Sequence, residues 1–181
     1  AHADLDRSLA DLDQAIRLDP KNAYAFYERG NALYDKRDYD RAIADLNQAI
    51  NIRPDYTAAF NVRGLAYNAK GDSDRAIADF DQALRIDPKF AAALSNRGDA
   101  FQKKHNFDRA IADFDQAIKT NPHYDVALNN RGTAYKSKGE LERALKDFDQ
   151  ALNINSSFAL ALFNRGETLE KIGYHDRAIQ D

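Results

Sequence analysis

The chain has 181 residues, of which 44% are hydrophobic and 30% charged, and its formal net charge is −3 at pH 7. This length suits one domain or one repeat array, and the small negative charge gives no electrostatic reason to expect a nucleic acid or an anionic membrane as partner. No stretch has the roughly 18 consecutive apolar residues of a membrane-spanning helix, and the lack of cysteine excludes disulfides and thiolate metal sites.

A period of 34 residues organises the chain. The residues that recur at this spacing are Pro20, Pro54, Pro88 and Pro122; Gly30, Gly64, Gly98, Gly132 and Gly166; and Ala42, Ala76, Ala110, Ala144 and Ala178. Residues 74–83 recur letter for letter at 108–117. The period predicts a lone second helix over 1–22, full repeats at 23–56, 57–90, 91–124 and 125–158, and a truncated repeat at 159–181. Because the chain lacks methionine and begins with alanine, we expect it to be a piece of a longer protein.

The first half of each repeat is predicted to be a helix. In the repeat 23–56, Phe26, Gly30 and Leu33 lie at helical spacing on one face. A glycine inside a helix costs about 1 kcal/mol relative to alanine. Its recurrence in every copy therefore indicates close approach of a second helix, which the small side chain of Ala42 would allow.

The second half is predicted to be another helix, with Ala42, Leu46 and Ala49 on its apolar face. Asp38 is a good N-cap for it, and Pro54 ends the repeat because the residue before a proline leaves the helical conformation. The equivalents of Asp38 are Asp72 and Asn106, and Gly71, Gly139 and Gly173 suit the turn just before this helix. One such helix pair cannot bury its apolar face alone, so a core requires stacking of neighbouring pairs.

These residues resemble the tetratricopeptide repeat over essentially the whole chain. The likeness rests on an aromatic residue or leucine four residues before the glycine, on an aromatic residue or leucine three residues after it, and on the alanines and proline of the second half. The resemblance implies an all-α fold, a right-handed superhelical solenoid of antiparallel helix pairs. Ser156 departs from it by replacing the proline, which should loosen that turn slightly.

Arginine precedes the glycine in every copy, where the family has leucine. These arginines are Arg29, Arg63, Arg97, Arg131 and Arg165, and the second helices carry Asp45, Asp79, Asp113, Asp147 and Asp181 sixteen residues later. Both sets border the apolar faces of their helices. We expect each arginine to pair with that aspartate across the two helices. The alternative is a solvated pair of Asp45 with Arg41 on the same helix.

The outward face of the first helices varies most between the repeats. In tetratricopeptide arrays the corresponding face lines a concave groove, so the resemblance implies a protein or an extended peptide as partner. The candidate binding residues are Tyr27, Asn31, Tyr34, Asn61, Asn68, Asn96, Asp99, Asn129, Asn130, Thr133 and Asn164. Asparagine amides can both donate to and accept from a peptide unit, although asparagine is also a common solvated residue on exposed helices.

One part of this face resembles a feature of a particular member of the family. Asn96, Asn130 and Asn164 resemble the asparagine ladder in the repeat domain of O-linked N-acetylglucosamine transferase, although Glu28 and Val62 occupy the earlier positions. The lysines of a carboxylate clamp are absent from the innermost positions.

No constellation of residues indicates catalysis, a cofactor or a metal. The four histidines fall on turns or at the chain start without ligand spacing, and aspartates such as Asp79 and Asp81 recur once per repeat, as on a solvated face. The leading interpretation is therefore a non-enzymatic scaffold that binds through the concave face. Two alternatives are a module that self-associates through exposed ends and the interaction domain of a larger enzyme.

Overall fold

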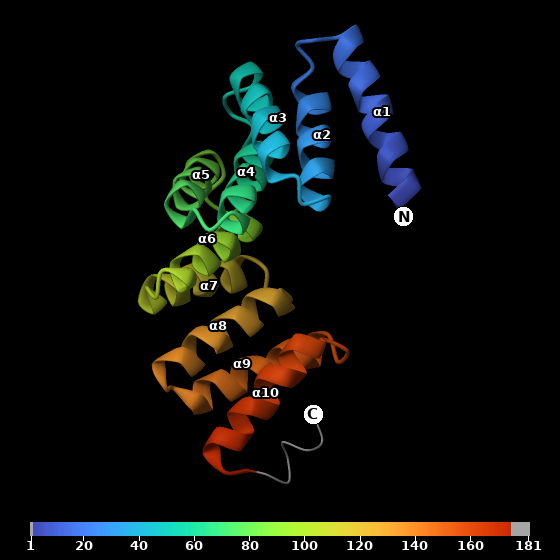
Figure 1. Cartoon of the computed structure of the whole chain (residues 1–181). Helices are drawn as coiled ribbons and strands as arrows, with labels where there is room; N and C mark the ends of the chain where they lie inside the picture. Colours follow the sequence, from blue (N-terminus) through green and yellow to red (C-terminus); the bar gives the residue numbers. More distant parts are fainter. Residues whose placement is uncertain (1, 175–181) are drawn as a thin grey trace. The chain divides into compact units, whose positions relative to one another are not determined.

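The computed structural model describes residues 2–174, with side chains from residue 5 onward, and every regular element in this range is an α-helix (Figure 1). The helices are α1 (His2–Leu18), α2 (Ala23–Asp35), α3 (Tyr39–Ile52), α4 (Thr57–Ala69), α5 (Ser73–Ile86), α6 (Ala91–Lys103), α7 (Phe107–Thr120), α8 (Asp125–Lys138), α9 (Leu141–Ile154) and α10 (Ala159–Ile172). The all-α class predicted from the sequence is confirmed.

The chain divides into two compact units, Ala1–Pro88 with α1 to α5 and Lys89–Asp181 with α6 to α10. In the first unit each helix packs against the next, and the first helices α2 and α4 also touch each other. The second unit has the same arrangement, with direct contacts from α6 to α8 and from α8 to α10. Each unit therefore has two layers, one of first helices and one of second helices.

Side chains cap the start of the second helices α3, α5 and α7, whereas α9 has no side-chain cap bond. The carboxylate of Asp72 accepts a hydrogen bond from the backbone N–H of Arg75 at 3.1 Å, and the amide oxygen of Asn106 accepts one from Arg109 at 3.3 Å. These bonds satisfy donors that the first turn of a helix leaves free. At the other end, α9 stops at Ile154, as α3 stops at Ile52, although serine replaces the proline there.

The residue before each cap turns the chain in the left-handed conformation. Gly71, Gly139 and Gly173 have φ angles of 83°, 80° and 94°, as the sequence predicted for the turn between the helices. Arg37 and His105 occupy the same place in their repeats and also have positive φ, 62° and 58°. A side chain with a Cβ atom is strained in this region, so two of the five turns are held by residues that disfavour them.

The core forms where first and second helices cross at the repeated glycines. A Cβ atom added at Gly98 would lie 2.7 Å from a ring carbon of Phe114, and one added at Gly30 would lie 2.8 Å from Cγ of Leu46. Phe114 and Leu46 are completely buried. The close approach that the sequence predicted is confirmed, and the side chain that fills the space is the large apolar residue of the second helix rather than the alanine beside it.

Candidate functional site

The arginines beside the glycines join the first helices to the second helices. Nε of Arg29 lies 2.6 Å from Oδ2 of Asp45, and the same two-pronged pairing recurs as Arg63 with Asp79, Arg97 with Asp113 and Arg131 with Asp147. The pairing across helices is confirmed for these four. The alternative is wrong, because Arg41 pairs with Asp38 instead. The fifth partner, Asp181, lies outside the described residues.

Four of these arginines also have a second arm that the sequence interpretation missed. Nη1 of Arg131 lies 2.6 Å from Asp115, sixteen residues earlier on the second helix of the preceding repeat. Equivalent bonds join Arg29 to Asp13, Arg63 to Asn47 and Arg165 to Asp149. The expected solvated face is wrong for Asp79, which is buried and paired with Arg63, whereas Asp13, Asp115 and Asp149 are paired but stay at least partly exposed. One guanidinium bridges three helices because its planar fork has donors on two edges.

Burial and pairing act in opposite directions on these guanidinium groups. Burial by itself lowers the pKa of Arg131, but the hydrogen bonds with Asp147 and Asp115 outweigh it and raise the pKa above its ordinary value. Asp147 is 3% exposed. The arginines therefore stay charged and fully occupied inside the protein, and they fix the spacing of the first helices.

The first helices present one face away from this core, which we call the first-helix face. It consists of the second, fifth, sixth and ninth residues of each first helix, which share one side because they are spaced by three and four residues. In α2 these are Tyr24, Tyr27, Glu28 and Asn31, and in α10 they are Leu160, Phe163, Asn164 and Glu167.

The predicted site residues differ in exposure, and two of them, Tyr34 and Asn68, are the twelfth residues of their helices and lie outside the first-helix face. Partly exposed are Tyr27, Asn31, Tyr34, Asn96, Asp99, Asn130 and Thr133; buried are Asn61, Asn68, Asn129 and Asn164. The expectation that all of them point outward is wrong for the last four. The reason is visible between α8 and α10, where Nδ2 of Asn164 donates to Oδ1 of Asn129 at 3.0 Å. Neighbouring first helices touch, and the amides of Asn129 and Asn164 bond to each other at this contact instead of facing solvent.

Several exposed apolar side chains also lie on the first-helix face, and the site predicted from the sequence did not include them. Tyr24 is 61% exposed and Phe163 62%, and Val126 and Leu160 are exposed as well. Val126 and Leu160 occupy the same position one repeat apart, and that recurrence was the available signal. Large exposed apolar residues that lie on one face of neighbouring helices, as Val126, Leu160 and Phe163 do on α8 and α10, indicate a contact surface.

In the first unit the exposed residues form an aromatic row. The ring centroids of Tyr24 and Tyr27 are 6.4 Å apart and those of Tyr27 and Tyr56 are 4.9 Å apart. The guanidinium of Arg53 lies 3.5 Å from the centroid of Tyr56. Burial raises the pKa of Tyr27, and the neighbouring carboxylate of Glu28 raises it further. The phenols are therefore neutral donors beside a carboxylate.

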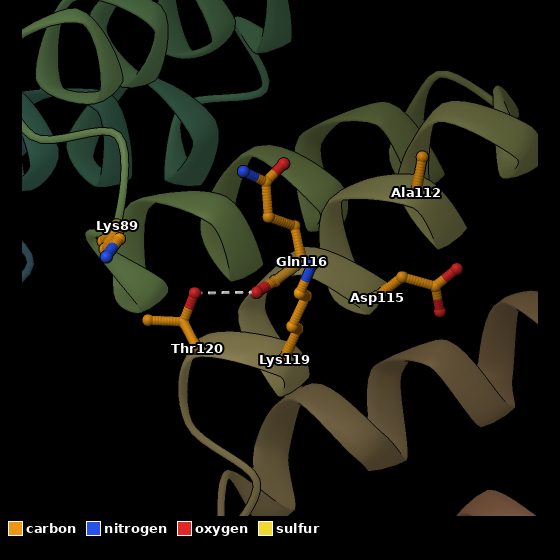
Figure 2. Close-up of a pocket in the computed structure, with 6 residues that line it drawn as sticks. All are labelled: Lys89, Ala112, Asp115, Gln116, Lys119 and Thr120. Atoms are coloured by element: carbon orange, nitrogen blue, oxygen red, sulfur yellow. Dashed lines mark hydrogen bonds between the residues drawn. The ribbon is translucent and has the colours of Figure 1, made fainter.

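Figure 2 shows a hollow on the other layer of the second unit, lined by Lys89 and by residues of α7. Its other lining residues are Ala112, Asp115, Gln116, Lys119 and Thr120. The hydroxyl of Thr120 donates to the backbone carbonyl of Gln116 at 2.9 Å, and Asp115 is paired with Arg131. The α7 side chains around the hollow are exposed, so they lack the buried, convergent polar groups of a small-molecule site.

No group of three or more histidine, aspartate or glutamate side chains in residues 2–174 is arranged to hold a metal ion. Within the same range, none of the helices combines the length and the apolar character needed to cross a bilayer.

Models of known protein families match most of the chain. A tetratricopeptide repeat family model matches residues 1–57 and 27–91, and two further models of this repeat match 91–124 and 132–173. The chain belongs to the tetratricopeptide repeat family. No curated protein sequence gives a significant match.

Solved tetratricopeptide repeat structures share the fold. PilW, a widely conserved type IV pilus biogenesis factor, aligns with a TM-score of 0.90 and 23% identity over 99% of this chain and 83% of its own. MamA aligns with a TM-score of 0.76 and 23% identity over 87% of this chain and 92% of its own. YrrB, described as a TPR protein with an unusual peptide-binding site, aligns with a TM-score of 0.71 and 21% identity over 93% of this chain and 87% of its own. These likenesses confirm the tetratricopeptide-type solenoid of antiparallel helix pairs.

Proposed function

We propose that the chain is a non-enzymatic scaffold that binds an extended segment of a partner protein along its first-helix face. The observation that carries this proposal is the difference between the two sides of the first helices in the second unit. On the inner side, Arg131 is held by Asp147 and Asp115, whereas the first-helix face exposes Val126, Leu160 and Phe163 beside the partly exposed amide of Asn130. Apolar anchors next to donors and acceptors suit a peptide.

The partly exposed amides would hold the backbone of such a segment. Asn31 and Asn130 have the two donors and one acceptor that a peptide unit requires. Asn129 and Asn164 would instead set the position of the face, because they are buried where α8 and α10 meet and bond to each other, and Asn61 and Asn68 are buried as well. The proposal therefore assigns contact to the first group and support to the second.

A peptide library tests this proposal. Binding should weaken when Asn96 and Asn130 are changed to alanine, and again when Phe163 is, while the helical circular dichroism stays unchanged. Lys119→Ala is the control, because Lys119 is exposed on the second-helix layer. If the Asn and Phe variants bind the library peptides as well as the parent chain does, the first-helix face is not the binding surface.

We also propose a second role, self-association through α1. Ser8, Leu12 and Ala15 of α1 lie 34 residues before Ala42, Leu46 and Ala49, which are completely buried in α3. In α1 they are exposed or partly exposed and line a hollow together with Arg7 and Asp11. In a complete repeat, the first helix packs against these positions of the second helix and covers them.

A further inference from the structure

Within the proposed peptide-binding role, we infer that the cluster of Tyr24, Tyr27, Tyr56 and Glu28 receives an arginine side chain of the bound segment. The cluster lies entirely in the first unit, on α2 and at the start of α4. Its equivalents in the other repeats lack this composition. In the place of Glu28, for instance, stand Val62, Asn96, Asn130 and Asn164.

The carboxylate of Glu28 gives the cluster its charge. It accepts a hydrogen bond from the hydroxyl of Tyr24, which raises the pKa of that phenol, and its charge also acts on Tyr27 and Tyr56. Among the residues that the structure describes, no lysine or arginine forms an ion pair with Glu28. The cluster thus presents a negative charge and the exposed ring of Tyr24 without a cation of its own at Glu28, while Arg53 already covers the ring of Tyr56.

The protein already stacks arginines on rings of this kind. Arg53 covers Tyr56 at one end of the row with its guanidinium 3.5 Å from the ring centroid, and Arg143 covers Tyr135 at 3.9 Å. The opposite end of the row is Tyr24, which is 61% exposed. A second guanidinium could stack on Tyr24 while it donates to Glu28, because its planar group has both a face and several N–H donors.

An apolar side chain or a proline suits the cluster less well. Either would cover Glu28 without supplying a donor, and a carboxylate that loses water without gaining a partner is costly. A lysine supplies charge but has no planar face for stacking. The expected order of preference is therefore arginine, then lysine, then neutral residues.

Four labelled peptides test this inference directly. They are short glycine-, serine- and alanine-rich peptides that differ at one central pair of residues: arginine, lysine, citrulline or norleucine. Citrulline has the shape of arginine without its charge. We expect the arginine peptide to bind most tightly in fluorescence anisotropy, and to shift the ring signals of Tyr24 and Tyr27 in nuclear magnetic resonance spectra of labelled protein.

Two variants locate the effect. Tyr24→Ala and Glu28→Gln should each weaken binding of the arginine peptide about threefold to fivefold, the size expected for an exposed cation–ring contact. Tyr174→Ala, which removes an exposed ring outside the first-helix face, and Glu170→Gln on α10 are matched controls and should leave it unchanged. Neither test variant affects a buried side chain, and circular dichroism checks the fold.

Two outcomes separate this inference from the proposed function. If library peptides bind the first-helix face but citrulline or norleucine peptides bind as well as arginine, the inference fails and the scaffold role stands. If Tyr24→Ala and Glu28→Gln leave arginine binding unchanged, the inference fails in the same way. If no peptide of either set binds, both proposals fail.

Discussion

A guanidinium that bonds to two carboxylates cannot be replaced by a hydrocarbon without leaving charge behind. In Arg131 the two partners differ, since Asp147 is buried whereas Asp115 is exposed. The inner contact therefore carries most of the cost of removal, and the outer contact mainly ties the repeat to the one before it. The same distinction holds for Arg29 between Asp45 and Asp13.

Arg131→Leu should destabilise the protein by about 3–5 kcal/mol, because it leaves Asp147 buried without a partner. Urea denaturation followed by circular dichroism measures the change. The double change Arg131→Leu with Asp147→Leu should cost clearly less, since no buried charge remains. Arg41→Leu is the control, because the side chain of that arginine is 68% exposed and pairs with Asp38 at the surface. Equal stability of Arg131→Leu and the parent chain would show that the ion pair of Arg131 with Asp147 contributes nothing to stability.

The repeated glycine gives a second test at single-residue scale. Gly98→Ala gains helix propensity worth about 1 kcal/mol, but the new methyl group would meet the buried ring of Phe114 at 2.7 Å. Overpacking of this kind costs about 1–3 kcal/mol, so we expect net destabilisation in thermal unfolding. A Gly98→Ala variant more stable than the parent would mean that the ring moves aside without cost.

At the scale of the helix pair, the turn before each second helix is fixed by backbone conformation. Arg37 holds the left-handed conformation that Gly71 holds in the next repeat, and its side chain is exposed. Arg37→Gly should therefore stabilise the protein by about 1 kcal/mol, because a left-handed residue with a Cβ atom is strained by roughly that amount. Thermal unfolding measures the gain. The mirror change, Gly71→Arg, should lower stability by a similar amount, and a destabilising Arg37→Gly would refute the strain.

The elements themselves could be predicted from the sequence because several local signals agree. Asp38 before the second helix, Pro54 after it and Gly30 at the crossing each indicate the same helix pair. The second arm of the arginines could not be predicted in this way. Asp13 and Asp115 lie on the polar side of their own helices, and only the stacking of the next repeat brings an arginine to them.

At the scale of the whole molecule, the candidate site was only partly predictable. Helical spacing places Asn31 and Asn130 correctly on the outward side of the first helices. It cannot say which outward positions the neighbouring first helix covers, and so it treated Asn129 and Asn130 alike although Asn129 is 1% exposed. Burial at such contacts depends on how repeats stack, and one helix does not contain that information.

The exposed surface around Ser8, Leu12 and Ala15 on α1 leads to a prediction about association of whole molecules. Leu12 and Ala15 expose an apolar surface whose equivalents elsewhere are covered by a first helix, and exposed repeat faces favour association. We expect a concentration-dependent rise in mass by sedimentation velocity up to about 100 µM, because association follows mass action. Leu12→Lys should abolish the association by placing a charge on this surface. Leu18→Lys should not, because Leu18 lies on the same helix but outside this surface, where it is 79% exposed. A single monomeric species over this range would exclude association through α1, and equal effects of the two variants would locate the contact elsewhere.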